Sequence, residues 1–124
     1  MSKTPKVLIV EDDKFISKAM SMQFKAKKFM VKAVLNAEDG LELLKIWIPD
    51  AIILDILLPG IDGYEFLKRV KSNKKLKNIP VIVASNLAQD EEKSKGAIEY
   101  IVKSDLDLDG LVKKALRNVK YGIS

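Results

Sequence analysis

An apolar run that ends in one carboxylate is the feature that most constrains this chain. Residues 52–54 are Ile, Ile and Leu, and Asp55 follows them directly, ahead of the pairs Pro59-Gly60 and Asp62-Gly63. A short run of β-formers without polar residues is typical of a strand buried on both faces of a parallel sheet. Such a strand carries its last residue to the edge where open α/β sheets bind ligands. The pattern therefore predicts a chemical role for Asp55.

Short apolar runs and amphipathic stretches alternate through the rest of the chain. Four further strands are predicted at residues 6–10, 29–35, 80–84 and 100–102, and helices at about 16–24, 36–46, 63–70 and 108–119. Asp13 is expected to cap the first of these helices. Alternation of this kind predicts an α/β fold with a parallel sheet and helices on both faces. No repeat or linker interrupts residues 1–124, which predicts a single domain.

The residue types that are missing exclude several kinds of chemistry. The 124 residues include no cysteine and no histidine, so thiolate and imidazole ligands are excluded. The net charge of +5 comes without basic-aromatic interleaving, which favours a solvated basic surface over direct nucleic-acid binding. No apolar run approaches transmembrane length and no signal region opens the chain. These features predict a cytoplasmic protein without membrane contact.

Polar residues stand at the predicted carboxyl ends of four strands. Glu11 and Asp12 follow the first strand, Asp55 the third, Ser85 the fourth and Lys103 the fifth. Because parallel strands end at one edge of the sheet, these side chains are expected to converge there. Three crowded carboxylates repel one another unless a cation is present, and an all-oxygen donor set suits a hard cation such as Mg2+.

This set of residues predicts phosphoryl transfer. A carboxylate such as Asp55 can serve as the nucleophile in aspartyl-phosphate formation. Lys103 can pair with Asp55 at rest and with phosphate oxygens afterwards, and the Ser85 hydroxyl can donate to one of those oxygens. Since the chain has no histidine, a phosphohistidine donor must belong to another protein.

With these residues in this order, the chain resembles the receiver domain of two-component response regulators from end to end. The segments Leu58-Pro59-Gly60 and Asp62-Gly63 are also similar to that family's loop. The resemblance implies a flavodoxin-like, doubly wound, five-stranded parallel sheet of order 2-1-3-4-5. It implies a phosphoacceptor switch and not an enzyme, with a histidine kinase or a histidine phosphotransfer protein as the donor.

The resemblance also implies how the metal is held. Asp55 is the implied phosphoacceptor. Asp12, Asp55 and the backbone carbonyl of Leu57 are the implied ligands of Mg2+, for which Mn2+ can substitute. Glu11 is implied to act through a metal-bound water.

A switch is implied as well. Ser85 moves toward the phosphate that Lys103 binds, and Tyr100, three residues before Lys103, rotates inward behind it. The surface formed by residues 87–95, the strand of Tyr100 and the closing helix at 108–119 then changes its affinity for a downstream protein.

Two residues near the site depart from the family's pattern. Ser104 stands where proline usually follows the lysine at position 103, which predicts an ordinary trans peptide there. Asn86 replaces the small residue that usually follows the switch hydroxyl, and it is expected to narrow access to Asp55.

Two further departures concern output and lifetime. Residues 85–100 are about four fewer than in the family, close to one helical turn, which predicts a shortened or irregular helix at residues 87–95. Leu57 and Leu87 each lie two residues after a site residue, beside the path of the hydrolytic water. Neither side chain can orient a water molecule, so slow self-dephosphorylation is predicted.

Three other functions are compatible with part of the sequence. A phosphatase of the haloacid-dehalogenase type needs a second Asp at position 57, where this chain has Leu. A flavodoxin-type phosphate loop conflicts with the carboxylates at residues 11–13. A pseudo-receiver that serves only as a docking scaffold stays open. The chain ends at residues 121–124 without a linker, which favours a stand-alone domain.

Overall fold

The computed structural model describes residues 4–119; residues 1–3 and 120–124, including the ending that favours a stand-alone domain, lie outside the described residues. The strands are β1 (Lys6–Val10), β2 (Met30–Val34), β3 (Ala51–Leu54), β4 (Val81–Ser85) and β5 (Glu99–Val102). The helices are α1 (Lys14–Ala26), α2 (Ala37–Leu43), α3 (Gly63–Lys71), the 3-10 helix η1 (Lys103–Asp105) and α4 (Leu108–Asn118).

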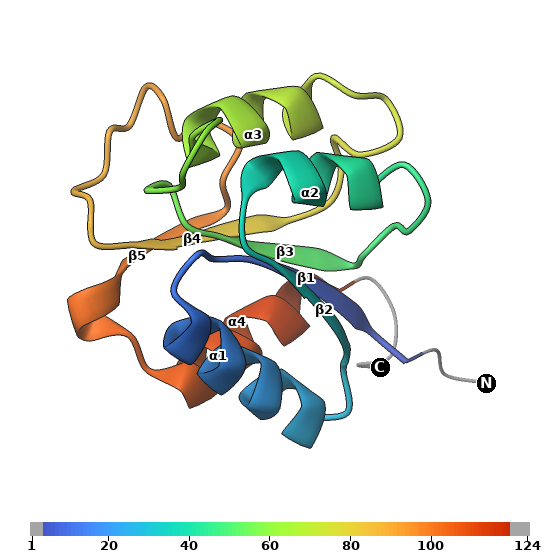
Figure 1. Cartoon of the computed structure of the whole chain (residues 1–124). Helices are drawn as coiled ribbons and strands as arrows, with labels where there is room; N and C mark the ends of the chain where they lie inside the picture. The colour runs from blue at the N-terminus through green and yellow to red at the C-terminus, as the bar shows by residue number, and fades with distance from the viewer. Residues whose placement is uncertain (1–3, 120–124) are drawn as a thin grey trace.

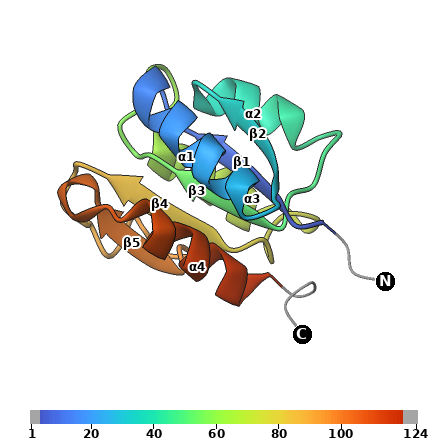
Figure 2. The same cartoon turned by 90° about the horizontal axis from the view of Figure 1, so that it is seen from below.

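All five strands lie in one parallel sheet of order β2-β1-β3-β4-β5, which confirms the predicted topology. Figure 1 shows α2 and α3 on one face of the sheet and α1 and α4 on the other. The view from below in Figure 2 shows α1 and α4 running side by side over the sheet. Because the helices cover the two faces of the sheet, the carboxyl ends of the strands are left free to form a site.

Side chains of the central strands alternate between two cores. Leu8 and Ile52 pack with Phe66 of α3, whereas Ile9 packs with Phe24 of α1 on the opposite face. All five are fully buried. Burial of each such side chain contributes about 1.5–3 kcal/mol, so β1 and β3 are held from both sides. The strand at residues 51–54 is therefore buried on both faces, as the sequence predicted.

The strand register aligns the residues that follow the strands. Val10 is opposite Leu54, so Glu11 and Asp55 leave β1 and β3 at the same level. Ser85 is opposite Val102, the residue before Lys103. The polar residues at the strand ends therefore share one edge of the sheet, as the sequence predicted.

The loop after β1 turns sharply into α1 because Asp13 caps the helix. Its Oδ1 accepts hydrogen bonds from the backbone N–H groups of Phe15 and Ile16, at N···O distances of 2.9 and 3.1 Å. Both amides belong to the first helical turn, where they have no partner within the helix. The predicted cap is confirmed, and Asp12 is left facing solvent.

The second helix is shorter than predicted. The expectation of a helix to about residue 46 is wrong, because α2 ends at Leu43. The amides of Lys45 and Ile46 donate to carbonyls three residues back, those of Glu42 and Leu43, which is the tighter spacing of a 3-10 turn. The chain turns here toward β3, and Ile46 is left 85% exposed.

Residues 86–98, between β4 and β5, contain no helix, and residues 91–96 form turns. This confirms the predicted shortening and extends it, since a single i→i−4 hydrogen bond, from Ser94 N–H to the Asp90 carbonyl, takes the place of a regular helix. Gly96, with φ of +96°, lies against α3, where a Cβ would approach Lys71 Cγ to 2.8 Å. The loop thus packs closely against α3 at Gly96.

Candidate functional site

Asp55 is a buried carboxylate with two fixed hydrogen bonds. It follows β3 directly and is 4% exposed. Its Oδ1 accepts from the backbone N–H of Leu57 at 3.1 Å, and its Oδ2 accepts from Lys103 Nζ at 2.8 Å. A charged carboxylate is costly to bury unless it is paired in this way. The bonds hold the carboxylate at the mouth of β3.

Lys103 joins two carboxylates across the sheet edge. Besides its contact with Asp55, its Nζ lies 2.6 Å from Glu11 Oε1, and the lysine side chain is 9% exposed. Burial opposes the charged ammonium, but the hydrogen bonds to Asp55 and Glu11 outweigh burial, and the pKa of Lys103 is raised. The pairing with Asp55 was expected from the sequence, whereas the contact with Glu11 was not.

Glu11 is the most enclosed of the site carboxylates. It is 1% exposed, and its Oε2 accepts the backbone N–H of Asp13 at 3.0 Å. Burial raises the pKa of Glu11 to about 7, although the Lys103 and Asp13 hydrogen bonds act in the opposite direction. Two buried carboxylates therefore share one lysine, and the negative charge at this edge is only partly balanced.

Glu11, Asp12 and Asp55 together fit a divalent cation. Each offers a carboxylate oxygen, and these oxygens all lie within 4.8 Å of one another. These three carboxyl groups face one ammonium among the described residues of the site. Mg2+ prefers oxygen ligands and keeps several waters, and the exposed Asp12 leaves one side open to solvent. The donor set matches the cation that the sequence predicted.

Ser85 and Tyr100 are linked through the backbone of Leu87. Ser85, fully buried at the end of β4, accepts the Leu87 N–H at 3.3 Å through its Oγ. The Tyr100 hydroxyl donates to the Leu87 carbonyl at 2.8 Å, and burial raises the pKa of Tyr100 to about 12. One residue of the β4–β5 loop thus contacts both predicted switch side chains. The sequence placed Ser85 and Tyr100 in the site but did not indicate this link.

The remaining predicted residues lie at the surface around these groups. Asn86 is exposed, and its side chain has no hydrogen bond to any other residue from 4 to 119. Leu57 is 51% exposed and Leu87 is 37% exposed. Residues 4–119 contain no cis peptide bond, in agreement with the expectation for Ser104.

Comparison with known proteins identifies the family that this fold and site define. The family model of the response regulator receiver domain matches residues 7–116, and the chain belongs to that family. Receiver domains are switch domains of two-component signalling and not enzymes in the usual sense.

Two transcriptional regulators illustrate the relationship. The regulatory protein AfsQ1 of Streptomyces coelicolor is 34% identical over 119 residues, a match that covers 91% of this chain and 52% of that protein. The phosphate regulon regulator PhoB of Rhizobium meliloti is 30% identical over 122 residues, covering 94% of this chain and 54% of that protein. The chain therefore spans about half the length of these curated relatives.

Solved structures show the same likeness. The receiver domain of a Francisella response regulator has a TM-score of 0.83 and 28% identity, covering 94% of this chain and 98% of that one. The BeF3-activated DrrB receiver domain has a TM-score of 0.81 and 28% identity, covering 95% and 99%. Among the described residues, no helix is both long and apolar enough to cross a membrane.

Proposed function

We propose that the chain receives a phosphoryl group on Asp55 from a phosphohistidine of a partner protein. The observation that carries the proposal is the buried Asp55 carboxylate between an acidic cluster and the ammonium of Lys103. The donor is a histidine kinase or a histidine phosphotransfer protein, since the chain itself has no histidine. Membership in the receiver family supports this assignment and a location in the cytoplasm.

The transfer needs little from the protein beyond position and charge. A carboxylate oxygen of Asp55 forms the new O–P bond while the P–N bond to the partner's imidazole breaks. The imidazole nitrogen keeps the bonding electron pair and takes up a proton from solvent. Lys103, which starts on Asp55 Oδ2, stays within reach of the phosphoryl oxygens. The Ser85 hydroxyl donates to another of these oxygens.

The metal site is proposed from the same cluster. Asp12, Asp55 and the Leu57 backbone carbonyl would hold Mg2+ or Mn2+, with Glu11 acting through a water molecule. When bound, the cation supplies positive charge against the phosphoryl oxygens. The oxygen donors within 4.8 Å of one another support this assignment.

The output is proposed to pass through Leu87. A Ser85 hydroxyl that turns toward the phosphoryl group releases the Leu87 N–H, and Tyr100 holds the carbonyl of the same residue. Residues 87–95, β5 and α4 would then change their affinity for a downstream protein. Because residues 87–95 have no helix, the shape of the loop itself is the expected signal.

Intact mass spectrometry after incubation with acetyl phosphate and Mg2+ tests the proposal. We expect one adduct of a single phosphoryl group in the wild type and none in Asp55→Asn. Addition of EDTA should abolish the adduct. A wild-type protein that forms no adduct with acetyl phosphate or phosphoramidate would contradict the proposal and favour a pseudo-receiver scaffold.

A further inference from the structure

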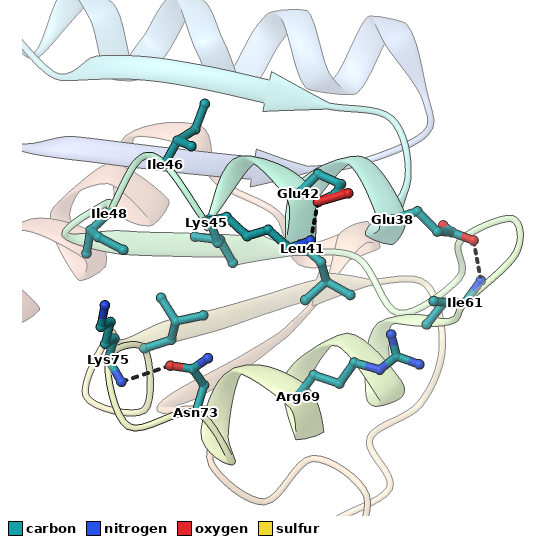
Figure 3. A pocket seen from close by; sticks show the side chains of 12 residues that line it. Glu38, Leu41, Glu42, Lys45, Ile46, Ile48, Ile61, Arg69, Asn73 and Lys75 are labelled. Carbon is teal, nitrogen blue, oxygen red and sulfur yellow. Dashed lines mark hydrogen bonds and ion pairs between the residues drawn. The ribbon is translucent and has the colours of Figure 1, made fainter.

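Glu38 links the first turn of α2 to the loop that follows Asp55. Its Oε2 accepts a hydrogen bond from the backbone N–H of Ile61, at an N···O distance of 3.2 Å. Figure 3 shows this contact at one end of the groove of about 770 Å³ between α2 and α3. The two residues are 23 positions apart in the chain, so the bond joins separate elements.

The α2 end of this link is anchored firmly. Ala37 is fully buried, and the Asn36 side chain caps the helix by accepting the Asp39 N–H at 2.7 Å. A Cβ at Gly40 would lie 3.0 Å from Phe66 Cε2, which shows how closely α2 approaches α3 at this level. The backbone that carries Glu38 therefore has little freedom to shift.

The loop end, by contrast, donates few backbone hydrogen bonds, although the side chains of Leu58 and Ile61 pack against the core. Residues 57–62 belong to no helix or strand, and the backbone amides found to donate within this range are those of Leu57 and Ile61. Leu57 donates to Asp55, which belongs to the site itself. The bond to Glu38 thus adds a backbone hydrogen bond at Ile61 to the packing of Leu58 and Ile61 against the core and to the cap that Asp62 forms on α3.

Gly60 permits the close approach of Glu38. It has φ of +72°, a conformation that favours glycine, and a Cβ on this residue would overlap the Glu38 carboxylate. The glycine therefore both turns the loop and leaves room for the acceptor. The Glu38 side chain in α2 and the glycine at position 60 in the loop are therefore both suited to this contact.

We propose that Glu38 is a positioning residue for the metal site. By holding Ile61, it keeps the loop in the shape that presents the Leu57 carbonyl to Mg2+. Residues that orient a ligand from outside the ligand set commonly change metal affinity, because they spare the site the cost of ordering at the moment of binding. This inference rests on the proposed function, since it requires that Leu57 be a ligand.

Calorimetric titration of Mg2+ into the full chain tests the inference. We expect Glu38→Ala to raise the Kd for Mg2+ about two- to tenfold, the effect of one modest hydrogen bond. Glu38→Gln keeps an acceptor oxygen without the charge and should bind within about twofold of the wild type. Glu42→Ala is the matched control, because Glu42 is one turn further along α2 and contacts Lys45 instead of the loop.

Amide hydrogen exchange provides a readout that needs no metal. In metal-free protein, Glu38→Ala should speed the exchange of the Ile61 amide at least severalfold and leave the amides of β3 unchanged. Glu38→Gln should retain most of the protection. A midpoint of thermal unfolding that stays close to that of the wild type would exclude a general loss of structure.

Three outcomes would overturn the inference. Unchanged Mg2+ affinity in Glu38→Ala would remove the positioning role, and equal weakening in Glu38→Ala and Glu38→Gln would assign the effect to charge alone. Unchanged exchange of the Ile61 amide would remove the tether. A wild type that binds no Mg2+ is a distinct result that contradicts the metal site, and with it the role assigned here.

Discussion

Lys103 Nζ lies 2.6 Å from Glu11 Oε1, so a lysine after β5 neutralises a buried carboxylate that follows β1. The same ammonium is 2.8 Å from Asp55 Oδ2. Lys103 is therefore shared between the proposed phosphoacceptor and an inner carboxylate, instead of serving the acceptor alone.

Lys103→Met should destabilise the metal-free protein strongly. Removal of one partner leaves two buried carboxylates without a counter-ion, and such losses cost roughly 3 kcal/mol or more. Mg2+ should restore more stability to the variant than to the wild type, because the cation replaces the missing positive charge. Urea unfolding with EDTA and with Mg2+ measures both effects. Lys113→Met, which removes an exposed pair with Asp109, should cost far less, because solvent screens that pair.

Glu11 should make the metal-free protein less stable as the pH rises toward neutrality. Burial raises its pKa from 4.5 to about 7. Between these values the folded protein holds more protons at Glu11 than the unfolded chain, so the free energy of unfolding falls as pH increases. Urea unfolding from pH 4.5 to 8 should show this loss in the wild type relative to Glu11→Gln. A constant difference between the two proteins across that range would disprove it.

Tyr100→Phe should loosen the β4–β5 loop. The variant loses the hydrogen bond from the hydroxyl to the Leu87 carbonyl, at a cost of about 0.5–1.5 kcal/mol. Hydrogen exchange across residues 87–96 should become faster, while that of β4 should not change. Tyr64→Phe is the comparison: the Tyr64 hydroxyl is buried and interacts with that of Tyr100, but it makes no hydrogen bond to the Leu87 carbonyl. Its removal should change the exchange of residues 87–96 less than Tyr100→Phe does.

Slow self-dephosphorylation is predicted from Leu57 and Leu87. Both side chains are partly exposed, so polar replacements can be made without disturbing a core. Leu57→Asn or Leu87→Glu can orient a water toward the phosphoryl group. Each variant should shorten the half-life of the phosphorylated protein about tenfold, which is less than the roughly hundredfold or greater rate increase that a well-placed general base provides. The decay of the intact-mass adduct measures this. Half-lives that stay unchanged in both variants would count against the prediction.

Much of the fold could be predicted from the sequence because its signals are local. Apolar runs of β-formers, helical spacing and the cap at Asp13 depend on residues near one another in the chain, and each corresponds to an observed element. The shortening after Ser85 could be predicted by comparing the number of residues from 85 to 100 with that of the resembled family. The early end of α2 could not, because the apolar residues around Ile46 keep helical spacing although the chain must turn toward β3.

The residues at the ends of the strands can be read directly from the sequence, and parallel topology brings Glu11, Asp55 and Lys103 to one edge of the sheet. The pairs of atoms that meet at this edge follow from the folded structure instead. The second partner of Lys103 and the tether from Glu38 to Ile61 join residues far apart in the chain. Such contacts depend on strand register, helix packing and side-chain rotamers, and no local pattern in the sequence encodes them.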